Sequence, residues 1–156
     1  EMSKITKLNR ISLTALGFQY DESEKIWISD ADFLLLEEDY IFEEDIFVRG
    51  HLIITGSVIA KNIFCKTLIC LGKLKGISVI CPKAAIVYDN LFLDFLETDK
   101  LQALRGINIE KCNVKDMISC NGPCLIKSLD INHNVFERIS KHGLNLKTPN
   151  SIRKPE

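Results

Sequence analysis

The sequence lacks several features that would point directly to a class of protein. It has no uninterrupted apolar stretch of the ~18 residues that a membrane-spanning helix needs. Its most apolar region, residues 52–87, is cut by Lys61, Lys66, Lys73 and Lys75. The N-terminus lacks the charged and then apolar pattern of a signal peptide. The sequence therefore predicts a cytoplasmic protein without a membrane span, with delivery into a host cell as an open alternative.

Extremes of composition are also missing. The chain has 156 residues, of which 46% are hydrophobic and 26% are charged, and its formal net charge is −1. Disordered and fibrous proteins have much more biased compositions. This length and composition predict a single globular domain with a sizeable buried core.

Motifs of the common catalytic and cofactor sites are absent. The sequence contains no Walker lysine loop, no GxGxxG, no GxSxG and no HExxH. Its histidines, His51, His133 and His142, are scattered and lack the carboxylate spacing of a catalytic dyad. No run of Lys and Arg with interleaved aromatics suggests a nucleic-acid surface. We therefore expect no enzymatic activity, no cofactor, no small-molecule substrate and no nucleic-acid partner.

Residues 52–87 contain a short repeat. Pairs of apolar or small residues at i and i+2, the mark of a strand with one buried face, begin at 52, 58, 63, 68, 74, 79 and 84. The spacings are 6, 5 and 5, twice over, so Leu52 aligns with Leu68, Gly56 with Gly72 and Cys65 with Cys81. Three short strands per 16-residue period predict a coil of an all-β, three-sided β-solenoid. A flat antiparallel meander is the alternative, but these spacings leave too little strand for hairpins.

The extent of the repeat predicts where the caps, coils and tail of the chain lie. Residues 1–144 are predicted to form one solenoid domain, with an N-terminal cap at 1–25, coils at 26–131 and a C-terminal helical cap at 132–144. Residues 145–156 are polar and are expected to be a flexible tail. Residues 88–105 interrupt the alternation, with apolar residues at 91, 92, 95, 96, 101 and 104. This spacing predicts a small helical insertion near 89–104 or a bulging loop.

The cysteines follow the same repeat. None of them forms a CxxC pair, and the closest spacing, between Cys120 and Cys124, is poor for zinc. All fall on predicted inward positions, where a thiol behaves as a small hydrophobe: Cys65, Cys70, Cys81, Cys112, Cys120 and Cys124. No metal site is predicted, and a redox or metal role for the neighbours Cys65 and Cys81 is the alternative.

Charge is distributed unevenly along the chain. Residues 26–48 contain eight acids and no Lys or Arg, whereas the chain from Arg49 onward is basic. Such asymmetry can mark an interaction surface, and a solvated acidic edge is the alternative. The predicted partner-binding residues are Glu37, Glu38, Asp39, Glu43, Glu44 and Asp45.

The segment "VRGHLIITGSVIAKNIFCKTLICLGKLKGISVICP" resembles the bactofilin-type β-helix domain of polymer-forming bacterial cytoskeletal proteins. The likeness covers roughly residues 45–87, with a weaker echo at 106–131. It implies a right-handed triangular β-helix that assembles end to end into nucleotide-independent filaments. A second resemblance is to the left-handed hexapeptide-repeat acyltransferases and γ-type carbonic anhydrases, whose strict hexads the 6-5-5 spacing violates.

These observations lead to a functional expectation. The chain is predicted to be a non-enzymatic β-solenoid that binds a protein partner, as an accessory, immunity-like or effector-type module. The alternatives are a self-assembling structural protein of the bactofilin kind and, less favoured by the spacing, a hexapeptide-repeat enzyme.

Overall fold

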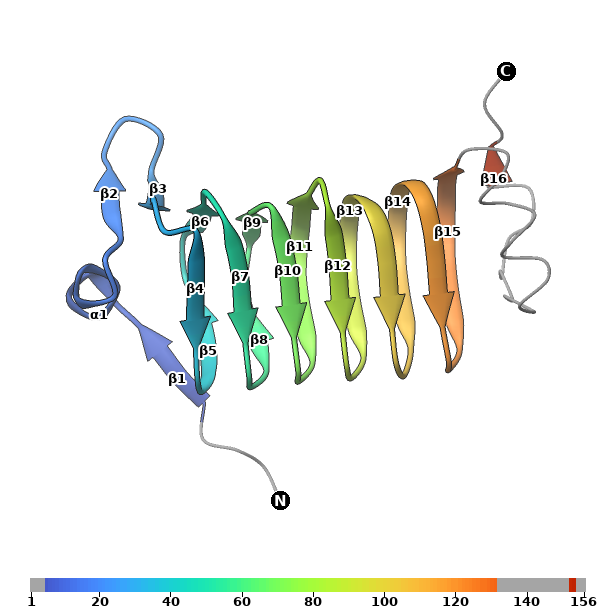
Figure 1. The fold of residues 1–156 in the computed structure, drawn as a ribbon, viewed down its shortest axis with the longest axis horizontal. Helices are drawn as coiled ribbons and strands as arrows, with labels where there is room; N and C mark the ends of the chain where they lie inside the picture. Colours follow the sequence, from blue (N-terminus) through green and yellow to red (C-terminus); the bar gives the residue numbers. More distant parts are fainter. Residues whose placement is uncertain (1–4, 132–151, 154–156) are drawn as a thin grey trace.

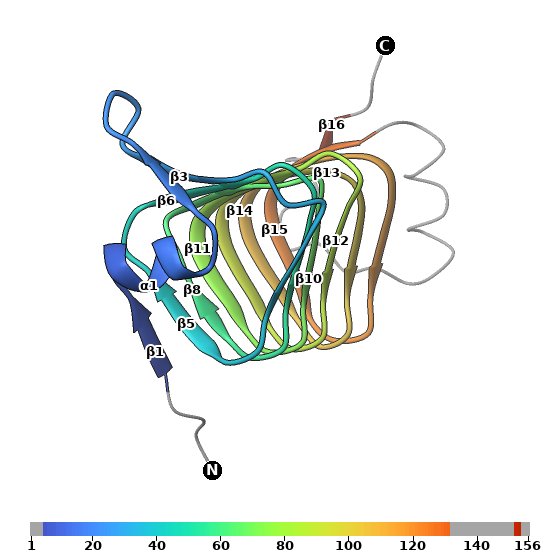
Figure 2. The same cartoon turned by 60° about the vertical axis from the view of Figure 1, so that its left-hand side comes forward.

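The chain winds into a β-solenoid of about six turns (Figure 1). The computed structural model describes residues 5–131 and 152–153. Nearly all strand pairs are parallel, because each strand pairs with the equivalent strand of the next coil. The front strands in Figure 1 run downward while the chain advances to the right, so the solenoid is right-handed, and Figure 2 agrees. The predicted three-sided β-solenoid is confirmed.

Three flat sheets, here named faces 1, 2 and 3, form the sides of the solenoid (Figure 2). Face 1 contains β4 (Phe33–Leu36), β7 (His51–Ile54), β10 (Thr67–Cys70), β12 (Ala84–Val87) and the ends of β13 (Leu91–Ala103) and β14 (Ile107–Cys120). Face 2 contains β1 (Ile5–Leu8), β5 (Asp39–Phe42), β8 (Val58–Ile59) and the first parts of β11 (Leu74–Cys81), β13, β14 and β15 (Cys124–Ile131). Face 3 contains β3 (Ile26–Ser29), β6 (Asp45–Val48), β9 (Asn62–Phe64), the second part of β11, the middle parts of β13 and β14, and the second part of β15.

Alternation along each strand builds the core. In β7 and β10 the second and fourth residues are buried, and their neighbours face outward. Residues one coil apart therefore stack in inward columns, such as Leu52 beside Leu68 and Ile63 beside Val79. From Ile46 onward the core side chains are branched or small apolar groups, which suits a narrow solenoid interior. The buried aromatic residues, Phe18, Trp27, Tyr40 and Phe42, precede them in the chain.

The coil length differs from the constant 16 residues that the sequence predicts. Leu68 pairs with Leu52 in the preceding coil but with Ala85 in the following one, so the lag is 16 and then 17. The predicted inward pair Ala84 and Ile86 is consequently wrong, because Ala85 and Val87 are the buried residues. The additional residue is absorbed at the corner of Pro82 and Lys83, where backbone bends need no strand pairing.

The predicted helical insertion near 89–104 is also wrong. Residues 91–103 form the long strand β13, which turns through all three faces of one coil. Leu91, Leu93, Leu96 and Leu101 are buried inside. The helical spacing in the sequence arose because the outward residues Phe92 and Phe95 are apolar as well, which disguised the alternation.

The N-terminal segment lies at the first-coil end of the solenoid (Figures 1 and 2). Helix α1 (Arg10–Ala15) begins after Asn9, whose side chain accepts a hydrogen bond from the Ser12 amide, as an N-cap does. Leu13 and Phe18 are buried in the core cluster, and β2 (Gln19–Asp21) pairs antiparallel with β3. These contacts join residues 5–25 to the first coil.

The predicted C-terminal helical cap at 132–144 lies outside the described residues. Of the predicted tail, only β16 (Ile152–Arg153) is described, and it pairs in parallel with β15. Within residues 5–131 and 152–153, no helix is long and apolar enough to cross a membrane.

Candidate interaction surface

The predicted acidic residues lie on two corners of the first coils, and several contact the N-terminal segment. Glu38 accepts a hydrogen bond from the Thr6 hydroxyl at 2.9 Å, and Glu43 forms an ion pair with Lys7 at 2.7 Å. Glu44 accepts hydrogen bonds from the Tyr20 hydroxyl and the Trp27 indole N–H, both at 2.9 Å. The hydrogen bond from Trp27 is the main cause of a lowered pKa at Glu44.

The two aspartates of the acidic run accept hydrogen bonds from residues of the next coil. The side chain of Asp39 is only 5% exposed, and its Oδ1 accepts a hydrogen bond from the backbone N–H of Ser57 at 2.6 Å. Asp45 accepts a hydrogen bond from the side-chain amide of Asn62 at 2.9 Å. Glu37 is exposed at its corner. The role of these six residues in partner binding stays a prediction. Glu38 and Glu43 make exposed surface contacts, and Asp39, Glu44 and Asp45 make partly buried hydrogen bonds.

Face 1 carries an apolar outer surface that the sequence analysis did not single out. We call it the face 1 patch; it comprises Phe33, Leu35, Ile53, Ile69, Ile86 and the corner residues Leu71 and Tyr88. Phe33 and Leu35 are 70% and 52% exposed. No charged residue occupies an outward position of β4, β7, β10 or β12. Two of these outward residues, Ile53 and Ile69, lie between the members of the inward pairs that define the repeat, so the sequence already contains them.

The edges of the face 1 patch are polar. At one edge the ring of His51 packs on that of Phe33, with centroids 4.7 Å apart. Lys66 and Lys83, the residues before β10 and β12, are exposed at the corner beside this edge. Lys100 is an exposed residue of β13, one position before Leu101, which pairs with Ala85. Lys100 pairs with Asp116 at 3.8 Å. An apolar centre bordered by charge is typical of protein interfaces.

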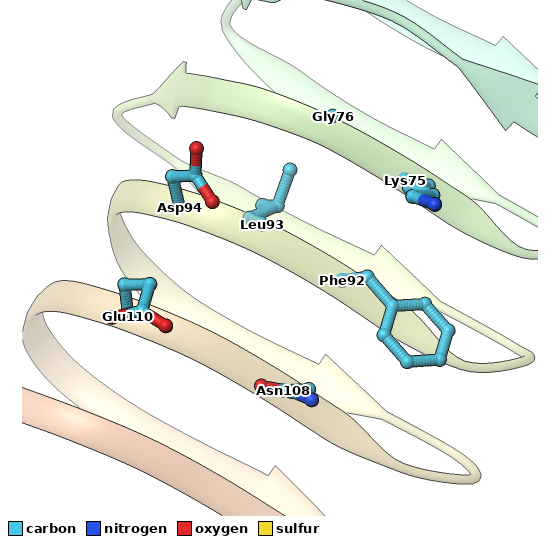
Figure 3. Close-up of a pocket in the computed structure, with 7 residues that line it drawn as sticks. All are labelled: Lys75, Gly76, Phe92, Leu93, Asp94, Asn108 and Glu110. Carbon is cyan, nitrogen blue, oxygen red and sulfur yellow. The ribbon is translucent and has the colours of Figure 1, made fainter.

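A shallow hollow lies on face 2 (Figure 3). It forms beside Gly76, which has no side chain, and its rim carries Lys75, Asp94 and Glu110. Glu110 is paired with Lys127 at 3.1 Å. Its lining contains an amine and two carboxylates but no serine, cysteine or histidine, so it offers polar contacts without a hydroxyl, thiol or imidazole group.

Five of the cysteines are buried, as their inward positions predict. Burial raises the pKa of Cys70 to about 11 and that of Cys81 to about 12. Cys120 is the exception, because it is only partly buried at a corner. In the part of the chain that the structure describes, no cluster of His, Cys, Asp or Glu side chains could hold a metal ion.

Comparison of this chain with known protein families, with curated proteins and with solved structures found no match.

Proposed function

We propose that the protein is a non-enzymatic β-solenoid that binds a protein partner through the face 1 patch. The observation that carries this proposal is the set of outward apolar side chains along four adjacent strands without an intervening charge. Phe33 and Leu35 of β4 are exposed, and the outward isoleucines of β7, β10 and β12 are partly exposed. Contiguous exposed apolar surface on a folded domain commonly marks an interaction site. The parallel ladder holds these side chains in fixed columns, so the surface is preorganised.

The size and border of the patch indicate what the partner must provide. Adjacent strands lie ~4.8 Å apart, and successive outward side chains on one strand lie ~7 Å apart. Four strands with two outward residues each therefore present a flat area on the order of 300 Å². Stable complexes bury about 800 Å² per partner. The contact must therefore include the corners, where Tyr88 is 48% exposed on one side and Lys66 and Lys83 are exposed on the other. We infer a partner whose apolar surface is bordered by carboxylates.

The test compares matched substitutions on two faces. Ile69 is an outward residue in the middle of the face 1 patch, and Ile59 is an outward residue of face 2 that is 44% exposed. The same change, Ile→Lys, is made at each position. Both variants and the wild-type protein are immobilised, exposed to extract of the native host, and the retained proteins are quantified by mass spectrometry.

Ile69→Lys should lose the proteins that the wild-type retains, whereas Ile59→Lys should keep them. Circular dichroism should show both variants folded, because each substitution places a charge in solvent. Equal retention by all three proteins, or selective loss with Ile59→Lys, would overturn the assignment to face 1.

Self-assembly of the bactofilin kind is the second candidate, and one observation favours it. Among the described strands, β4 pairs only with β7, so its outer edge is an unpaired template beside the exposed Phe33 and Leu35. One observation opposes self-assembly. At the same end of the solenoid, β1 pairs with β5 of face 2 and β2 pairs with β3 of face 3, so the outer edges of β5 and β3 are occupied. Negative-stain microscopy and light scattering distinguish the two: filaments support self-assembly, and a monodisperse species supports partner binding.

A further inference from the structure

The corner between β14 and β15 holds two cysteines. Cys120 is the last residue of β14 and Cys124 is the first residue of β15. In the preceding coil they pair with Ala103 and Ile107, which are both buried, so the two cysteines occupy inward columns on either side of one corner. Residues 121–123 make the bend that brings the two columns together.

An equivalent corner earlier in the chain provides an internal comparison. Residues 70–74 read "CLGKL" and residues 120–124 read "CNGPC". In both corners the first cysteine points its sulfur at backbone carbonyls: Cys70 Sγ lies 3.5 Å from the Gly72 oxygen, and Cys120 Sγ lies 3.3 Å from the Gly122 oxygen. The corners therefore share one backbone arrangement and one position for the first thiol.

The two corners differ in the properties that decide thiol chemistry. Cys70 is fully buried and faces the apolar Leu74 across its bend. Cys120 is only partly buried, and the residue across its bend is a second cysteine. Across the bend, the side chain of Cys124 interacts with the sulfur of Cys120. This interaction lowers the pKa of Cys120 and raises that of Cys124. An accessible, more acidic thiol beside a second thiol is the arrangement found in redox-sensing pairs.

We propose that Cys120 and Cys124 form a redox-active dithiol that a hydroperoxide oxidises to a disulfide. The Cys120 thiolate attacks the outer oxygen of the hydroperoxide; an S–O bond forms, the O–O bond breaks, and the alkoxide or hydroxide that leaves takes up a proton. The Cys124 thiol then gives up its proton and attacks the sulfur of the Cys120 sulfenic acid. An S–S bond forms, the S–O bond breaks, and the hydroxide leaves as water with the Cys124 proton.

Tryptic peptides of the full chain allow a direct test. Residues 116–127, "DMISCNGPCLIK", contain both cysteines, and residues 67–73, "TLICLGK", contain Cys70 alone. The native protein is treated with hydrogen peroxide, the excess is removed with catalase, free thiols are blocked with iodoacetamide under denaturing conditions, and the digest is analysed by mass spectrometry. Peptide 116–127 should lose two hydrogens and resist alkylation until dithiothreitol is added, while peptide 67–73 should be fully alkylated.

Two variants separate the roles of the sulfurs. In Cys124→Ala, peroxide should leave Cys120 as a sulfenic acid that dimedone traps. In Cys120→Ala, Cys124 should remain reduced, because it is buried. The wild-type result alone is decisive if either variant folds poorly: failure of peptide 116–127 to form a reducible internal disulfide, or equal oxidation of Cys70 and Cys120, would overturn the proposal.

Discussion

Leu68 pairs with Ala85 of the next coil, and both side chains are buried in the core. On the other side Leu68 pairs with Leu52, so it is enclosed between two coils. Ile69, one residue further, faces outward into the face 1 patch. This pair of neighbours, one inside and one outside, defines the register of β10.

Substitution of these neighbours should have opposite consequences. Leu68→Asp buries an unpaired carboxylate, which costs several kcal/mol out of a total stability of about 5–15 kcal/mol. It should therefore be insoluble or largely unfolded. Ile69→Asp should remain soluble with a circular dichroism spectrum like that of the wild-type. Equal damage at both positions would contradict a strand with only one buried side.

Asp39 should contribute to stability through a single hydrogen bond. Asp39→Ala leaves the Ser57 N–H without its acceptor, and this should lower the free energy of unfolding by about 1–3 kcal/mol. Asp39→Asn retains an acceptor oxygen and should lose less, and Glu37→Ala, at the exposed corner, is the control expected to change little. Urea denaturation measures all three; an Asp39→Ala variant as stable as Glu37→Ala would assign Asp39 no structural role.

The hydrogen bonds of Glu44 should make the N-terminal segment sensitive to acid. Because the pKa of Glu44 is lowered on folding, its contribution to stability is present above the ordinary pKa of 4.5 and is lost as pH falls through the folded-state pKa. The chain has one tryptophan, Trp27, so intrinsic fluorescence reports on this contact. Acidification below pH 4.5 should shift the emission of the wild-type protein.

Matched glutamate variants test this assignment. Glu44→Gln removes the ionisable group and should lose or displace the fluorescence transition. Glu43→Gln, which affects only the exposed pair with Lys7, should retain it. Identical transitions in both variants would attribute the acid response to another carboxylate.

Thiol accessibility should separate Cys120 from the other cysteines. Burial raises the pKa of Cys65, Cys70, Cys81 and Cys112 and keeps these thiols protonated and enclosed. At pH 8, Ellman's reagent should react rapidly with at most the Cys120–Cys124 pair of the native protein, because Cys124 can displace the reagent from Cys120. Unfolding should make all six thiols reactive. Rapid modification of Cys65, Cys70, Cys81 or Cys112 in the native state would contradict their inward register.

Much of the fold could be predicted from the sequence because one face of each strand is buried. Leu52, Leu68 and Val79 each begin a pair of apolar or small residues at i and i+2 that recurs at a regular spacing, so the inward columns were visible as pairs. The register after Pro82 could not be predicted, since Ala84 and Ala85 fit an inward position equally well by residue type. β13 was hidden for a related reason: Phe92 and Phe95 make its outward side apolar.

The candidate sites were harder to predict than the fold. The acidic run was recognised by its charge, but its contacts with Thr6, Lys7 and Tyr20 depend on how the N-terminal segment folds back. The face 1 patch depends on which outward residues stack across coils, which only the register reveals. The partial exposure of Cys120 depends on the corner, and its spacing to Cys124 was the only available signal.

Hydroxyl-radical footprinting of the complex formed with the retained host partner tests the central claim most directly. Phe33, Leu35 and Tyr88 represent face 1, and Ile59 and Phe92 represent face 2, all of them exposed in the free protein. Binding should reduce oxidation of the face 1 side chains and leave that of Ile59 and Phe92 unchanged. Protection of Ile59 and Phe92 with no change at Phe33 and Tyr88 would contradict face 1 as the binding surface.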